Sequence, residues 1–173
     1  MKTKITFLSI LFFIFFNSHF HAQVGFNVGT EYGIGAIAQA GSSKIKFEVG
    51  GGVTPILIFW QITGADAENY IKLYISGTVG AKLNIAINND EEHRLGFKFG
   101  ANYDTIIKAG FGAGIDYIIS ERFVFSGGAM YYPEAYRILL DRLNDEENTN
   151  YTEDQLSSFL VGFRPFVSLS IYL

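Results

Sequence analysis

Hydrophobic and polar residues alternate along most of the chain after its first two dozen positions. The longest example is 70–87, where every odd position from Ile71 to Ile87 is apolar or glycine. Every even position there is polar, small or tyrosine. Successive side chains of a β-strand point to opposite faces, so this period of two predicts a strand with one apolar and one polar face.

Six further segments show the same pattern, at 24–39, 44–53, 94–104, 107–119, 122–132 and 159–173. The breaks between segments are typical of turns or short loops and fall at 40–43, 63–68, 88–93, 105–106 and 120–121. Short links favour antiparallel pairing of neighbouring strands. The sequence therefore predicts an all-β, antiparallel, up-and-down fold.

One stretch, Pro133–Ser158, does not alternate. It is rich in acidic residues, namely Glu134, Asp141, Asp145, Glu146, Glu147, Glu153 and Asp154. Within it, Glu134–Leu143 places Tyr136, Leu139, Leu140 and Leu143 at helical spacing. We expect a short amphipathic helix followed by a solvated acidic loop.

The first residues, Met1–Ala22, follow the order of a secretory signal peptide. Lys2 and Lys4 precede an apolar run over 5–16, and Asn17-Ser18-His19 follows it. The run is shorter than the roughly 20 residues that a membrane-spanning helix needs. We expect cleavage after Ala22, with 23–173 as a single exported domain; the alternative is an uncleaved anchor.

Composition indicates which way the strand faces point. Alternation fits a soluble barrel with an apolar interior or a membrane barrel with an apolar exterior. The apolar faces carry many Phe, Tyr, Ile and Leu, too bulky for the narrow interior of an eight-stranded barrel. The other faces carry mostly Gly, Ser, Thr and Asn, and only 17% of the chain is charged, which is low for a soluble surface. The pattern favours a membrane barrel, with the soluble barrel as the alternative.

The chain resembles the small outer-membrane β-barrel proteins of Gram-negative bacteria, the porin-like or OmpA-like eight-stranded type. The resemblance rests on the signal peptide, the alternation and the last strand, Phe163–Leu173. It implies an outer-membrane location, contact with outer-membrane lipids, and recognition of the last strand by the barrel-assembly machinery. Family members usually end on an aromatic residue, whereas here Leu173 is last and Tyr172 precedes it.

The resemblance also implies eight strands, because bacterial single-chain barrels have even strand numbers. Only seven segments are visible, so one of them must contain two strands. The candidates are Lys44–Ile62, whose alternation weakens at Gly50-Gly51-Gly52 and after Pro55, and Val24–Ala40. A periplasmic C-terminus, as in the family, would place Pro133–Ser158 outside the cell, where it is the best candidate contact for an external partner.

Two sets of residues are candidates for a role in such a barrel. Charged residues on the polar faces are expected in the interior, where ion pairs would plug the lumen or line a channel; they are Lys46, Glu48, Lys72, Lys82, Lys98, Asp104, Lys108, Asp116, Arg122 and Arg164. Aromatic residues near strand ends are expected at the two membrane interfaces; they are Trp60, Tyr70, Tyr103, Tyr117, Tyr131, Tyr132 and Tyr172.

Few residues point to catalysis. The absence of cysteine excludes disulfides, zinc–thiolate sites and a thiol nucleophile. A formal net charge of −4 argues against nucleic-acid binding. His93 lies in an acidic turn, and no spacing supports the Ser-His-acid triad of lipid-A-modifying barrels. We expect no catalytic, cofactor-binding or metal-binding residue.

The pattern predicts a non-enzymatic integral outer-membrane β-barrel with a structural or surface-interacting role and a lumen plugged by interior charges. A narrow solute channel and a soluble periplasmic ligand-binding barrel are the alternatives.

Overall fold

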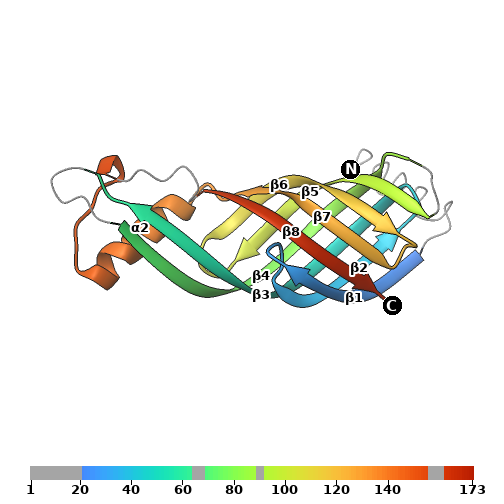
Figure 1. The fold of residues 1–173 in the computed structure, drawn as a ribbon, viewed down its shortest axis with the longest axis horizontal. Coiled ribbons are helices and arrows are strands. Elements are labelled where there is room, and N and C mark those ends of the chain that lie inside the picture. The colour runs from blue at the N-terminus through green and yellow to red at the C-terminus, as the bar shows by residue number, and fades with distance from the viewer. Residues whose placement is uncertain (1–20, 64–68, 89–91, 156–161) are drawn as a thin grey trace, which may run out of the picture.

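Eight antiparallel strands form one sheet that closes into a ring (Figure 1) in the computed structural model, which describes residues 21–63, 69–88, 92–155 and 162–173. The strands are β1 (His21–Gly29), β2 (Ile34–Gly41), β3 (Ile45–Gln61), β4 (Asn69–Ala86), β5 (His93–Asp104), β6 (Lys108–Ile119), β7 (Phe123–Tyr131) and β8 (Phe163–Tyr172). Each strand pairs with the next along the chain. Strand β8 closes the ring on β1, from Gly25↔Tyr172 to Gly29↔Ser168. The predicted all-β, up-and-down architecture is confirmed.

The eighth strand comes from a turn at 30–33, which divides Val24–Ala40 into β1 and β2. The other candidate division was wrong, because β3 runs unbroken through Gly50-Gly51-Gly52 and Pro55. Four residues separate the two new strands, so even positions face outward on both sides of the turn. Val28 is 56% exposed and Ile34 is 74% exposed. The alternation therefore crosses this turn without a change of phase.

Large apolar side chains point out of the ring, and polar ones point into it. Phe26, Phe97 and Val167 are 62%, 55% and 72% exposed. Their neighbours Asn27, Lys98 and Ser168 are buried. The ring is thus apolar outside and polar inside, the reverse of a soluble β-barrel.

Glycines on the inner faces leave space for large side chains in the lumen. A Cβ added at Gly50 would lie 2.7 Å from the ring of Tyr32, and one at Gly110 would lie 2.4 Å from the ring of Tyr132. Any larger residue at either position would displace these rings. The glycine-rich polar faces therefore serve the packing of the narrow interior.

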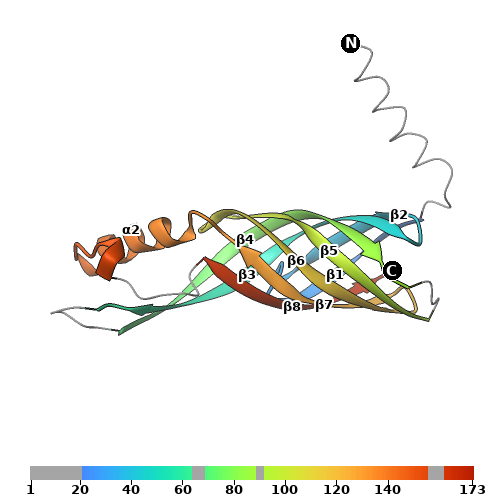
Figure 2. The same ribbon diagram turned by 90° about the horizontal axis from the view of Figure 1, so that it is seen from above.

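Strands β3 and β4 extend beyond their neighbours. Strand β2 last pairs with β3 at Ile34↔Val53. Strand β5 last pairs with β4 at Asp104↔Thr78. Strands β3 and β4 stay paired as far as Gln61↔Asn69. Residues 54–61 and 69–76 therefore form a two-stranded ribbon that projects past the ring (Figures 1 and 2).

Helix α2 (Ala135–Glu147) lies beside this ribbon (Figure 2), and the short 3-10 helix η1 (Glu153–Gln155) follows it. The predicted helix is confirmed, and it continues four residues beyond Leu143. It ends at Asn148, whose left-handed backbone (φ 54°) directs its N–H to the Asn144 carbonyl. Leu139, Leu140 and Leu143 share an apolar cluster with Ile56 and Ile58 of the ribbon and with Ile62, which follows it. Among the described residues, no helix is long and apolar enough to cross a membrane.

The predicted signal peptide mostly lies outside the described residues, which begin at His21. His21 and Ala22, its last two residues, pair with Gly41 and Ala40 at the start of β1. The start of β1 and the end of β8 lie at the same end of the ring, which we term the terminal rim (Figure 1). The ribbon and α2 lie at the opposite end, which we term the helical end.

Candidate functional site

The turn between β1 and β2 folds into the lumen. It carries Glu31 and Tyr32, which are 2% and 0% exposed. Gly33 closes the turn with a φ of +74°, and a Cβ there would lie 1.8 Å from the Val53 carbonyl oxygen. Because only glycine tolerates this backbone and this approach, Gly33 fixes the inward course of the turn.

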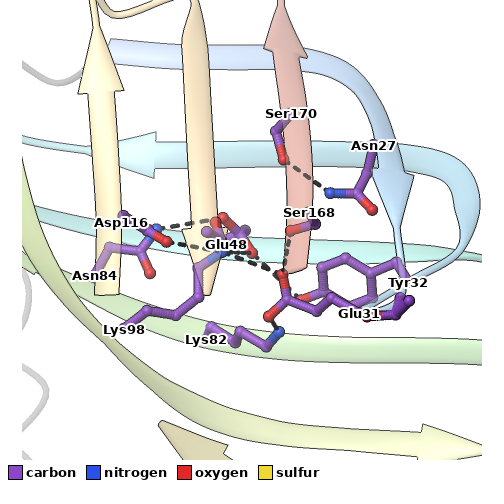
Figure 3. Close-up of polar contacts among 12 residues, drawn as sticks. Asn27, Glu31, Tyr32, Glu48, Lys82, Asn84, Lys98, Asp116, Ser168 and Ser170 are labelled. Atoms are coloured by element: carbon purple, nitrogen blue, oxygen red, sulfur yellow. Dashed lines mark hydrogen bonds and ion pairs between the residues drawn. The ribbon is translucent and has the colours of Figure 1, made fainter. Parts of the chain in front are cut away.

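Lys98 of β5 lies at the centre of the lumen (Figure 3). Its ammonium is 3.2 Å from Glu48 Oε1, 3.3 Å from Asp116 Oδ1 and 3.4 Å from Glu31 Oε2. It also donates a hydrogen bond of 3.1 Å to Ser126 Oγ. One buried cation thus joins β3, β6, β7 and the β1–β2 turn.

Lys82 of β4 supplies a second ammonium to the same cluster. It pairs with Oε1 of Glu31, while Lys98 contacts Oε2. The Lys82 ammonium also lies 4.3 Å from the centroid of the Tyr32 ring, a cation–π contact. We refer to Glu31, Glu48, Lys82, Lys98 and Asp116 as the lumenal network. Its charges are of both signs and in mutual contact, as burial requires.

Neutral side chains complete the coordination of Glu48. Tyr32 and Tyr172 donate hydroxyl hydrogen bonds of 3.4 and 3.3 Å to its two oxygens. The Asn84 amide donates another, of 3.3 Å. A carboxylate held by three donors and an ammonium is fixed in position, so Glu48 anchors the network on the β3 side of the ring.

The helical end of the lumen is closed differently. Asp104 accepts hydrogen bonds of 2.8 and 3.1 Å from the backbone N–H groups of Ile106 and Ile107, and Arg164 lies 3.6 Å from it. The apolar cluster beside this pair contains Ile106, Ile107, Met130, Tyr132 and Phe166, and continues into the contact between α2 and the ribbon. An ionic layer and an apolar layer therefore fill the lumen in series.

Not all of the predicted interior charges lie in this lumen. Six are buried there: Lys46, Glu48, Lys82, Lys98, Asp104 and Asp116. Arg164 reaches in from β8 to Asp104 and stays partly exposed. Lys72, Lys108 and Arg122 lie elsewhere.

Lys72 occupies an even position, as the inward-facing residues of β4 do, but it lies on the ribbon, beyond the ring. It pairs there with Glu146 and Glu147 of α2, and the Glu147 hydrogen bond raises the pKa of the Lys72 ammonium above its ordinary value. Lys108 is the first residue of β6, at the helical end, and its ammonium donates to the Thr105 carbonyl in the preceding turn. Arg122 is exposed in the turn before β7, one residue outside the strand. Alternation identifies the face of a residue, but not its height along the barrel.

Sequence reasoning missed two buried charges. Arg94 is 6% exposed and occupies an even position of β5, as Lys98 does, so the alternation was sufficient to identify it as inward-facing. Glu31 gave no such signal, because it lies in the turn that the unbroken alternation concealed.

The predicted interfacial aromatics divide into two groups. Tyr103, Tyr117 and Tyr131 point outward and are 48%, 38% and 39% exposed. Tyr132 and Tyr172 point into the lumen, and are 1% and 2% exposed, so they do not lie at an interface. The alternation explains both corrections. Tyr131 and Ile171 face outward, so the residues that follow them, Tyr132 and Tyr172, face inward.

The two remaining aromatics lie on the ribbon. Tyr70 packs at the edge of the cluster around α2, with its hydroxyl 3.3 Å from that of Tyr151. The backbone of Trp60 belongs to β3, but its side chain lies outside the described part of the structure.

His93 is exposed and hydrogen-bonds Tyr117, with 2.9 Å between Nδ1 and the hydroxyl. Within the described ranges, no group of three or more His, Cys, Asp and Glu side chains has the geometry to hold a metal. Comparisons with protein-family models, curated proteins and solved structures found no match to this chain.

Proposed function

We propose that this chain is an integral outer-membrane β-barrel with a closed lumen, acting as a structural or surface-interacting protein rather than as an enzyme. The observation that carries the proposal is the inverted polarity of the ring. Apolar side chains such as Val167, at 72% exposure, face outward, and paired charges such as Lys98, at 1%, face inward. In water this arrangement would leave many large apolar side chains solvated, each forgoing about 1.5–3 kcal/mol of burial.

The strand lengths support insertion into a bilayer. A membrane-crossing β-strand needs about 9–11 residues. Strands β5 and β6 have 12 residues, β8 has 10, β1 and β7 have 9, and β2 has 8. The ring therefore has the height that a hydrocarbon layer requires.

The contents of the lumen support a closed barrel over a solute channel. Eight strands enclose an interior just wide enough for side chains. Here the lumenal network and the apolar cluster at the helical end occupy it one after the other. A continuous column of water would require both layers to move.

The orientation follows from the resemblance to small outer-membrane barrels. If the terminal rim faces the periplasm, the ribbon and α2 lie outside the cell. The acidic 133–158 segment would then be the part of the protein that meets an external partner. Trypsin added to intact cells is expected to cleave at Arg137 or Arg142, both exposed on α2. Cleavage only after lysis would indicate that the helical end faces the periplasm.

Fractionation and conductance together test the proposed function. The full chain, expressed in a Gram-negative host, should remain in the outer membrane after a carbonate wash and leave it only with detergent. Release by osmotic shock would instead indicate a soluble periplasmic barrel. In planar bilayers the purified protein should give no stable openings, and regular openings would indicate a channel. The variant E31G/Y32G, which removes the side chains of the inward-folded turn, serves as the comparison and should conduct more than the wild type.

A further inference from the structure

The terminal rim contains a pocket with an excess of positive charge. Its polar lining comes from Ser43 and Lys44 of the β2–β3 turn, Lys46, Asn84, Arg94 and Asp116. The hollow is open to solvent, and its enclosed part has room for about one water molecule. Five segments of the ring thus converge on it, and three of the lining side chains are cationic.

Lys46 differs from the other buried lysines. It is 6% exposed, which is close to the burial of Lys82 and Lys98. Those two contact carboxylates, whereas no described residue forms a hydrogen bond or ion pair with the Lys46 ammonium. The Lys46 stem is buried, but its Nζ is not one of the fully buried atoms that lack a partner, so the ammonium reaches solvent through the pocket and keeps its three protons available to donate. Lys46 therefore presents a cation to an anion that enters the pocket.

Arg94 is the second buried cation of the pocket. It donates to the Ser43 carbonyl at 2.9 Å, which ties β5 to the β2–β3 turn, and lies 3.4 Å from Glu121. A guanidinium held in this way keeps its planar fork in a fixed orientation, the geometry that suits phosphate and carboxylate oxygens.

Two described carboxylates oppose an anion here. Asp116 is engaged by Lys98 at 3.3 Å, on the inner side. Glu121 is 40% exposed, and its contact with Arg94 lies on the turn before β7. Glu121 acts electrostatically on Lys46 as well, so an incoming anion would compete with this carboxylate at both cations.

We propose that this pocket binds a phosphate group, with Lys46 as its principal ligand and Arg94 as the second. Phosphate is favoured because it offers several acceptor oxygens and up to two negative charges to cations that approach from different strands. The group is either inorganic phosphate or the headgroup of a phospholipid. The inference does not rest on membrane insertion, because the pocket opens to solvent at the rim.

Calorimetric titration of the refolded full chain in a non-ionic detergent, free of phosphate, tests the proposal. Sodium phosphate is one titrant, and dihexanoyl phosphatidylglycerol is the other. Sodium chloride at matched ionic strength is the reference that removes general screening effects. Saturable binding of inorganic phosphate alone assigns a free anion, binding of the lipid alone assigns a headgroup, and both support the proposal. Saturation by neither titrant overturns it.

Three variants separate a specific site from general attraction. K46M keeps most of the side-chain volume and should weaken binding by about tenfold or more, which corresponds to about 1.4 kcal/mol. E121Q removes the competing carboxylate and should tighten binding. K108M, at the helical end, is the matched control and should bind as the wild type does. Equal affinity in K46M and wild type, or no gain in E121Q, contradicts the site. The E121Q result keeps the test decisive if K46M fails to fold.

Discussion

Lys98 is the residue on which the interior depends most. Its ammonium contacts three carboxylates that lie on different segments of the ring. Removing one partner from a buried ionic cluster is more harmful than removing the whole cluster, because the remaining charges stay buried without compensation.

The substitution Lys98→Met should therefore lower the free energy of unfolding by about 3–5 kcal/mol. Urea unfolding in detergent micelles, followed by circular dichroism, measures this change. The matched variant K108M, at the partly exposed start of β6, should unfold at the wild-type urea concentration. In the double variant K98M/E48Q part of the loss should be recovered, since one uncompensated carboxylate is gone. A K98M midpoint equal to that of the wild type would show that the network contributes no stability.

The turn before β7 contains backbone strain, and substitutions that remove this strain should stabilise the protein. Ser120 and Glu121 both have positive φ, 53° and 56°, which ordinary side chains disfavour and which asparagine and glycine tolerate. The double variant S120N/E121G should raise the free energy of unfolding by about 1 kcal/mol. The same urea experiment checks it. A fall in stability would mean that the Glu121 contact with Arg94 outweighs the backbone strain.

At this scale the sequence predicted a residue's face well and its environment poorly. The alternation correctly predicted that Glu48, Lys98 and Asp116 lie inside the ring. It predicted the same face for Lys72, although Lys72 lies beyond the ring against α2. What a side chain meets depends on the height at which its strand crosses the barrel, and that height is set by pairing that is not local in sequence.

At the scale of elements, the β3–β4 ribbon and α2 form a unit that is separate from the closed ring. A two-stranded ribbon is barely stable in isolation, and here α2 covers one of its faces. Leu143, at 0% exposure, is central to that contact.

The variant L143A should release α2 from the ribbon without unfolding the ring. Leu-to-Ala substitutions in a packed core cost about 2–5 kcal/mol, and here the loss falls on the local contact. Trypsin should then cleave faster at Arg137 and Arg142, while the heat-modifiable migration of the barrel on gels stays unchanged. D141A, on the exposed face of the same helix, is the control. Equal cleavage of L143A and wild type would show that Leu143 does not hold the helix.

A pH titration tests the ionic part of the same contact. The pKa of Lys72 is raised, so its pairing with Glu147 should persist at pH values where an ordinary lysine begins to lose its proton. This stabilising contribution is lost only as the pH rises through the raised pKa. Trypsin cleavage of α2 should therefore change more steeply in wild type than in K72M as the pH rises through the raised pKa of Lys72. Identical profiles would remove Lys72 from the contact.

Element boundaries show where sequence reasoning succeeds and fails. The helix at 134–143 was visible because its spacing differs from that of the strands. The turn at 30–33 was not visible, because its four residues leave the apolar positions of β1 and β2 in the same alternating pattern. Only Gly33 marks the turn in the sequence. The packing of α2 against the ribbon joins segments some 80 residues apart, such as Tyr70 and Tyr151, and no local pattern encodes it.

At the scale of the whole molecule, the composition of 49% hydrophobic and 17% charged residues is distributed with the apolar side chains outside the ring and the polar ones inside. The sequence predicted both faces of this barrel, because alternation is a local property. The closure of the lumen by a folded-in turn, two tyrosines and an ionic network was beyond it, since these parts meet only after all eight strands pair.

The central claim is that the outward faces contact lipid, and the absence of cysteine allows a direct test. Single cysteines replace Val79, Phe97, Phe99 and Phe125 on the outer faces, and Asp141 on α2 serves as the exposed reference. Each is labelled with a nitroxide, and the protein is reconstituted into vesicles. Electron paramagnetic resonance then compares collisions with oxygen, which concentrates in hydrocarbon, and with a water-soluble nickel chelate. The four outer positions should favour oxygen and position 141 should favour the chelate. Chelate-dominated collisions at all five positions would contradict a membrane-embedded barrel.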